Sequence, residues 1–119
     1  MQINKSGLWG EIYAARWLRD NKYDVLAANY RTRLGEIDII CSKGKNICFV
    51  EVKTRGENAI YLPREAVDLS KQDRIIATAM QYIKASKCRL QPRFDVCEII
   101  LNDKYEPISI KYIKNAFTS

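Results

Sequence analysis

Two neighbouring stretches of strand-forming sequence carry charged residues where folding alone would favour apolar ones. Asp38 lies within residues 35–41, and Glu51 and Lys53 lie within residues 47–54. A buried, unpaired carboxylate is costly, so an acid in such a strand needs a partner. Two carboxylates beside a lysine could hold a hard divalent cation, which takes oxygen ligands, neutralises a phosphate and helps to ionise water. The lysine could stabilise developing charge or orient the attacking water. This pattern therefore indicates metal-dependent hydrolysis of a phosphodiester.

The pairing register of the two strands decides whether the carboxylates meet. If the turn places Gly44 opposite Lys45, opposed residues have numbers that sum to 89. Asp38 then lies across from Glu51, with Cβ atoms about 5 Å apart. A sum of 88 turns Glu51 to the other face of the sheet. The sequence leaves both registers open. It also leaves open that Glu51 pairs with Lys53 on one face while Asp38 is solvated at the end of the sheet.

Composition excludes several other kinds of chemistry. The chain has 119 residues, of which 47% are hydrophobic and 29% are charged. These values are typical of a soluble globular protein, and we expect one domain over residues 1–119. Histidine is absent, which excludes Ser-His-Asp and Cys-His catalysis and histidine-based zinc sites. The net charge of +6 favours a polyanionic partner such as nucleic acid.

The expected location of the chain is the cytoplasm. No apolar run approaches the ~20 residues that a membrane-spanning helix needs, and the first residues show no signal peptide. We therefore expect no membrane partner. The four cysteines form no C-x-x-C pair. We expect them to be reduced thiols, three of them buried in strands.

Periodicity and turn residues predict an α/β protein. Apolar residues at helical spacing predict one helix over about 6–20 and another over about 70–86. Five runs of strand-forming residues are bounded by turn residues. The resulting order, α-β-β-β-α-β-β, indicates a mixed β-sheet flanked by helices. The expected strands are 23–33, 35–41, 47–54, 93–101 and 108–113.

Short motifs along the chain carry a resemblance to a known family. Asp38 followed at a distance by Glu51-Val52-Lys53 is similar to the D…(D/E)-x-K motif of restriction-endonuclease-like nucleases, and the element order resembles their α-β-β-β-α-β core. From Gly7 to Phe117 the chain resembles the YraN family, also called UPF0102. The motifs that carry this resemblance are Gly7-x-x-Gly10-Glu11-x-x-Ala14-Ala15, Gly35-Glu36-Ile37-Asp38-Ile39-Ile40, Phe49-Val50-Glu51-Val52-Lys53-Thr54-Arg55, Pro63-x-x-Ala66-Val67-x-x-x-Lys71, Arg93-Phe94-Asp95-Val96 and Ile113-x-Asn115-Ala116-Phe117.

The resemblance implies a role for each matching residue. Asp38 and Glu51 would be the central ligands of Mg²⁺ or Mn²⁺, with the Val52 carbonyl as a further oxygen. Glu11 would be the third acid, carried on the first helix, and Lys53 would be the catalytic lysine. The implied structural relatives are archaeal Holliday junction resolvases, which are dimeric. We therefore expect a homodimeric endonuclease that acts on branched or flapped DNA rather than on RNA. The alternative is a non-catalytic nucleic-acid-binding module that keeps the nuclease fold.

Six basic residues near the motif, at the expected hairpin tip or near the start of the second expected helix are candidate contacts to nucleic acid. Any one of them could equally be a solvated surface charge. The six are Arg31, Arg33, Lys43, Lys45, Arg55 and Lys71.

Three other residues leave a choice open. Gly10 inside the first helix costs about 1 kcal/mol relative to alanine. This glycine indicates one of two things: a backbone or a phosphate approaches the helix closely, or the helix packs tightly on the sheet. Arg93 and Asp95 share one face of a strand, where they either satisfy each other or support the site from behind. We favour the structural interpretation for this pair.

Overall fold

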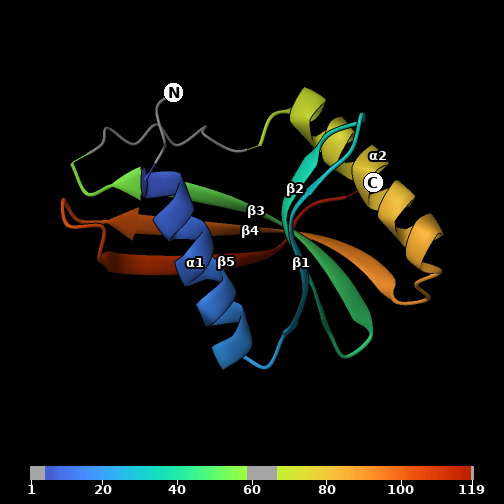
Figure 1. Cartoon of the computed structure of the whole chain (residues 1–119), viewed down its shortest axis with the longest axis horizontal. Helices are drawn as coiled ribbons and strands as arrows, with labels where there is room; N and C mark the ends of the chain where they lie inside the picture. Colours follow the sequence, from blue (N-terminus) through green and yellow to red (C-terminus); the bar gives the residue numbers. More distant parts are fainter. Residues whose placement is uncertain (1–4, 59–66, 119) are drawn as a thin grey trace.

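The computed structural model describes residues 5–58 and 67–118 (Figure 1). The elements follow the predicted order α-β-β-β-α-β-β. Helix α1 covers Lys5–Asp20 and helix α2 covers Leu69–Ser86. Pro63 and Ala66 of the fourth family motif lie outside the described residues. The strands are β1 Asp24–Arg31, β2 Glu36–Lys43, β3 Asn46–Gly56, β4 Gln91–Leu101 and β5 Pro107–Phe117.

The five strands form one sheet in the order β1-β2-β3-β4-β5. Neighbours are antiparallel except β3 and β4, which are parallel. Parallel neighbours need a long crossover connection, and α2 lies in that connection. The predicted α/β class with a mixed sheet is therefore confirmed, and the architecture is consistent with a restriction-endonuclease-like fold.

The two helices cover opposite faces of the sheet (Figure 1). On one face, Ala14 and Leu18 of α1 pack against buried strand residues. On the other face, Ile75 and Ala79 of α2 pack against a second buried cluster, which includes Phe49. Removal of these apolar stripes from water holds the three layers together. All four cysteines are free thiols, three of them buried in strands, as expected. In the part of the chain that the structure describes, neither helix is long and apolar enough to cross a bilayer.

Gly10 allows α1 to approach β3 closely. A Cβ atom at this position would lie 1.9 Å from Thr54 Oγ1 and 3.0 Å from Thr54 Cβ, which is closer than non-bonded atoms pack. Of the two explanations left open by the sequence, tight packing of helix on sheet therefore accounts for this glycine. The close approach also brings Glu11, the next residue, near the sheet.

Asp95 is the centre of a buried polar network. Its fully buried carboxylate accepts hydrogen bonds from the Arg93 guanidinium, the Tyr112 hydroxyl and the Asn115 backbone N–H. Arg93 also donates to the Tyr23 hydroxyl at 3.0 Å. A buried charge with this many donors is well compensated. Asp95 therefore joins β4 to β5, in agreement with the structural interpretation of the Arg93–Asp95 pair.

Candidate functional site

The β2–β3 hairpin adopts the register in which opposed residue numbers sum to 89. Each recorded pair fits this sum, and the last pair is Ile39 opposite Val50. Of the two registers left open by the sequence, this is the one that carries Asp38 toward Glu51. The pairing of β2 with β3 ends at Ile39 and Val50, one residue before Asp38 and Glu51. Both acids therefore lie at the point where the two strands separate.

Asp38 is held at this point by the backbone of β3. Its Oδ2 atom accepts a hydrogen bond of 2.8 Å from the Val52 N–H. Burial raises the pKa of Asp38 to about 7, and the negative charges of Glu51 and Glu11 add to this effect. The Val52 hydrogen bond and the charge of Lys71 oppose it. A further cation close to Asp38 would lower this pKa and favour the ionised carboxylate.

Glu11 reaches the same region from α1. Burial raises the pKa of Glu11, the charges of Glu36 and Glu51 raise it further, and a hydrogen bond with the Asn29 side chain opposes the shift. Asn29 has a φ of 52°, the left-handed conformation that asparagine tolerates better than most residues. This irregular residue in β1 gives Glu11 a hydrogen-bonding partner.

Lys71 of α2 forms an ion pair with Glu51. Its ammonium donates to Glu51 Oε1. The Glu51 side chain is only 8% exposed, whereas that of Lys71 is 45% exposed. The Asp68 carboxylate caps α2 by accepting a hydrogen bond from the Lys71 backbone N–H, which fixes the base of this side chain. A nearly buried carboxylate is thus neutralised by a lysine that can also reach solvent.

Asp38 and Glu51 together have the ligand chemistry for a hard divalent cation. Within residues 5–58 and 67–118, no three acidic or thiol side chains come close enough together to hold a metal ion. Magnesium is commonly bound by only one or two carboxylates and keeps several waters. Asp38 and Glu51 have the donor chemistry for such a site. Glu11 interacts with them through its charge and remains a predicted third ligand.

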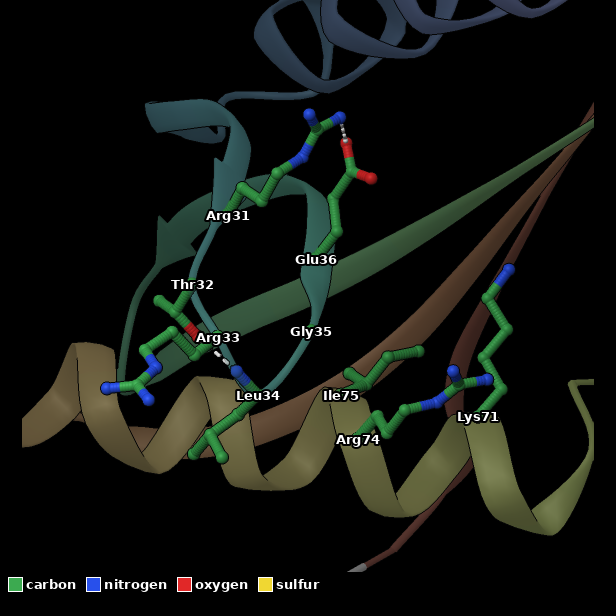
Figure 2. Close-up of a pocket in the computed structure, with 9 residues that line it drawn as sticks. All are labelled: Arg31, Thr32, Arg33, Leu34, Gly35, Glu36, Lys71, Arg74 and Ile75. Carbon is green, nitrogen blue, oxygen red and sulfur yellow. Dashed lines mark hydrogen bonds and ion pairs between the residues drawn. The ribbon is translucent and has the colours of Figure 1, made fainter.

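A basic pocket lies between the β1–β2 turn and α2 (Figure 2). Its volume is about 420 Å³. Gly35 lets the turn lie against the helix, because a Cβ atom there would lie 2.9 Å from Thr78 Oγ1. Arg31 and Glu36 form an ion pair of 3.1 Å on the strand side of the pocket. The lining residues are Arg31, Thr32, Arg33, Leu34, Gly35, Glu36, Lys71, Arg74 and Ile75.

Lys53 belongs to a second, smaller pocket. It shares a strand face with Glu51, two residues further along β3. The pocket has a volume of about 190 Å³, and Gln72 and Glu98 also line it. Helix α2 therefore contributes to both pockets, through Lys71 to the basic one and through Gln72 to the one at Lys53.

The structure separates the six predicted nucleic-acid contacts. Lys43 and Lys45 lie at the β2–β3 turn, at the opposite end of β2 from Asp38. The Lys43 ammonium donates to the Asn21 carbonyl at 2.8 Å. Arg55 lies near the end of β3. The remaining three line the basic pocket and are Arg31, Arg33 and Lys71.

Sequence comparison identifies the family of this chain. The model described as "Uncharacterised protein family UPF0102" matches residues 10–99. The chain belongs to the UPF0102 family. A UPF0102 protein of Clostridium beijerinckii is 43% identical over 118 residues, which are 98% of this chain and 96% of that protein. One from Caldanaerobacter subterraneus is 42% identical over 120 residues, with 98% of each chain covered. One from Clostridium botulinum is 45% identical over 113 residues, with coverage of 93% and 92%.

The UPF0102 match covers the candidate site. Its span of 10–99 includes Glu11, Asp38, Glu51 and Lys53. The family resemblance carried by the motifs is thereby confirmed. The names of these relatives state no activity, so the catalytic and metal-binding roles of the four residues remain predictions.

Two residues of this UPF0102 site were missed by sequence reasoning. Asn29 interrupts an otherwise strand-like run, and an asparagine there is a signal for a left-handed residue. Arg74 lines the basic pocket beside Lys71. Arg74 follows Lys71 by three residues, so both lie on one face of the helix. This spacing was the signal that could have added Arg74 to the predicted contacts.

Proposed function

We propose that this UPF0102 protein is a metal-dependent nuclease that hydrolyses phosphodiester bonds in DNA, with branched or flapped DNA as its substrate. Asp38 and Glu51, together with Glu11, would hold Mg²⁺ or Mn²⁺. The observation that carries the proposal is the approach of two carboxylates where β2 and β3 part, with burial and the charge of Glu51 raising the pKa of Asp38 to about 7. Such a pair favours binding of a cation at neutral pH.

The chain's own residues have distinct tasks in this proposal. A bound divalent cation would neutralise the reacting phosphate and favour ionisation of a water. The Val52 N–H holds Asp38 in place, and the Asn29 side chain holds Glu11. Lys53, from the smaller pocket, would place a positive charge next to the attacking water.

The charge distribution supports nucleic acid as the substrate class. The chain has a net charge of +6, and the basic pocket includes Lys71, which contacts Glu51 directly. Cleavage of two strands takes two sites, which a homodimer would supply. Sedimentation of the purified protein with and without a four-way junction tests this part, and the dimer predicts twice the chain mass of 13.8 kDa.

A cleavage assay tests the function. End-labelled single-stranded, duplex, flapped and four-way-junction DNA are incubated with Mg²⁺, Mn²⁺ or EDTA. We expect cleavage that requires the metal and is lost in Glu51→Gln and Lys53→Met. The exposed Glu57→Gln and Lys84→Met variants match these changes chemically and should cut as wild type does. Cleavage that persists in Glu51→Gln and Lys53→Met would remove the catalytic assignment.

One observation favours a second candidate, a non-catalytic nucleic-acid-binding module. The Lys71 ammonium already neutralises Glu51. A binding module of this kind would retain nucleic acid equally well in EDTA and in Mg²⁺, with an affinity that falls steeply as salt rises. The absence of cleavage on every substrate, together with such binding, would favour this candidate over the nuclease.

A further inference from the structure

Lys71 connects the two features that the proposed function uses separately. Its ammonium is bonded to Glu51, and its side chain also lines the basic pocket. A lysine has three donors on a long, flexible stem, so its ammonium can exchange one anionic partner for another without movement of the helix. The half-exposed position of Lys71 leaves room for that exchange.

Arg74 makes the pocket a favourable place for a second anion. It lies three residues after Lys71, so the two cations are neighbours on one face of α2. In Figure 2 the Lys71 side chain extends from α2 toward the strands, whereas the Arg74 side chain runs along the helix. Among residues 5–58 and 67–118, the Arg74 guanidinium has no ion pair. Glu36, the acid among the described lining residues, is paired with Arg31. Within residues 5–58 and 67–118, the pocket therefore keeps a positive charge beside Lys71 that no ion pair compensates.

We propose that this pocket is a phosphate-binding subsite, and that a nucleic-acid phosphate bound by Arg74 draws Lys71 away from Glu51 and so frees that carboxylate for a divalent cation. The pocket volume of about 420 Å³ lies within the range of small-molecule sites and exceeds the needs of a single phosphate group. This inference rests on the proposed function, because it takes Glu51 to be a ligand of the cation.

Lys71 and a divalent cation compete for the Glu51 carboxylate. While Lys71 is bonded to Glu51, a divalent cation must displace an ammonium before it can use that oxygen. A phosphate that captures Lys71 removes this competition, so phosphate and cation bind with positive cooperativity. Linkage requires the effect to be reciprocal, and the cation must strengthen phosphate binding by the same factor.

The first experiment measures Mn²⁺ affinity by electron paramagnetic resonance with no nucleic acid present. Lys71→Met removes the competing ammonium, and we expect Mn²⁺ to bind at least about fivefold more tightly, the lower end of typical coupling between sites. Lys84→Met, on the exposed part of the same helix, should leave the affinity unchanged. Lys71→Gln provides a second variant if Lys71→Met proves unstable, and circular dichroism checks that each is folded. Unchanged or weaker Mn²⁺ binding in both Lys71 variants would overturn the competition.

The second experiment measures fluorescence anisotropy of a labelled thymidine octamer in EDTA and in Mn²⁺. Wild type should bind the octamer at least about fivefold more tightly with Mn²⁺. Lys71→Met should abolish this gain, and Lys71→Arg, which keeps a cation at the position, should retain it. A direct contact between cation and phosphate would instead leave the gain intact in Lys71→Met and would overturn the role of Lys71.

Octamers with and without a 5′-phosphate identify the source of the phosphate. Arg74→Ala should weaken binding in EDTA, whereas Arg89→Ala, beyond the C-terminal end of α2, should not. A loss confined to the 5′-phosphorylated octamer assigns the pocket to a strand end, and an equal loss for both assigns it to a backbone phosphodiester. No loss for either would overturn the subsite.

A gel of each sample reports cleavage separately. Coupling that depends on Lys71 without any cleavage would support the subsite and count against the nuclease. Cleavage, together with Mn²⁺–octamer coupling that is unchanged in Lys71→Met, would support the nuclease and overturn this inference.

Discussion

The Asp38 carboxylate shows how a single buried acid can link pH to both stability and metal binding. Burial and the charge of Glu51 raise its pKa from 3.8 to about 7. A raised pKa means that the folded state binds the proton more tightly than the unfolded state does. The stability from this group is therefore fully present below about pH 4 and is lost as the pH rises through about 7.

Asp38→Asn should remove this pH dependence. The amide oxygen can still accept the Val52 N–H, but it carries no charge. In EDTA, the free energy of unfolding of Asp38→Asn should rise relative to wild type between pH 4.5 and pH 8, by up to about 4 kcal/mol at 1.4 kcal/mol per pKa unit. Urea denaturation across this range measures the difference, with Glu57→Gln as control. A constant difference would show that Asp38 titrates normally.

Metal binding at the same group should have the opposite dependence on pH. A cation and a proton compete for the Asp38 carboxylate, so Mn²⁺ affinity should rise as the pH passes from 6 to 8. Titration calorimetry in two buffers with different ionisation enthalpies would also detect the released proton. Affinity that is flat over this range would place the cation away from Asp38.

Asp95 is a second buried acid with a different purpose. It is fully enclosed by donors, and Arg93 is its ion-pair partner at 3.0 Å. Asp95→Asn would leave this mostly buried guanidinium unpaired, and we expect a loss of about 3 to 5 kcal/mol in the free energy of unfolding. Chemical denaturation measures the loss, with the exposed Asp24→Asn as control. A small loss together with weaker Mn²⁺ binding would instead indicate that Asp95 supports the site.

At the scale of the element, the contact between α1 and β3 sets the position of Glu11. Gly10→Ala would gain about 1 kcal/mol of helix propensity. The added Cβ would lie 1.9 Å from Thr54 Oγ1, so α1 must move away from the sheet. We expect a net destabilisation of about 1 to 3 kcal/mol, the usual cost of overpacking. Gly56→Ala, where an added Cβ meets nothing within 4 Å, is the matched control.

Thr54→Ala in the Gly10→Ala background provides the decisive comparison. It removes the Oγ1 atom that causes the closest contact, so it should recover part of the lost free energy of unfolding. A double-mutant cycle gives this coupling. Equal losses in the single and double variants would mean that the Gly10 effect comes from somewhere other than Thr54.

The sequence predicts the helices and strands better than it predicts how these elements pack against one another. Turn residues and alternation within 35–54 identified the hairpin and reduced its register to two choices, because strand pairing is local. The bond between Lys71 and Glu51 joins residues 20 apart and depends on how α2 docks on the sheet. Asn29 and Arg74 were missed for the same reason: the approach of Asn29 to Glu11 and the place of Arg74 in the basic pocket are set by tertiary packing, which no local periodicity encodes.

At the scale of the whole molecule, five of the six predicted nucleic-acid contacts fall into two groups separated along β2, the basic pocket and the hairpin turn. Lys43 and Lys45 lie at the hairpin turn, five residues and more beyond Asp38. At about 3.3 Å per residue, roughly 17 Å separate the site from the turn. A DNA strand advances about 3.4 Å per nucleotide, so about five nucleotides are needed to span this distance.

The length of the DNA should therefore decide which lysines and arginines affect binding. Arg74→Ala should weaken the binding of both a four-nucleotide strand and a twenty-base-pair duplex, because Arg74 shares the basic pocket with Lys71, which contacts Glu51. Lys45→Ala should leave the short strand unaffected and lower the dependence of log affinity on log salt for the duplex by about 0.9, the value for one phosphate contact. Anisotropy titrations from 50 to 300 mM salt in EDTA measure both slopes. If Lys45→Ala leaves the duplex slope unchanged, the hairpin turn lies off the DNA path, and bound DNA follows the basic pocket alone.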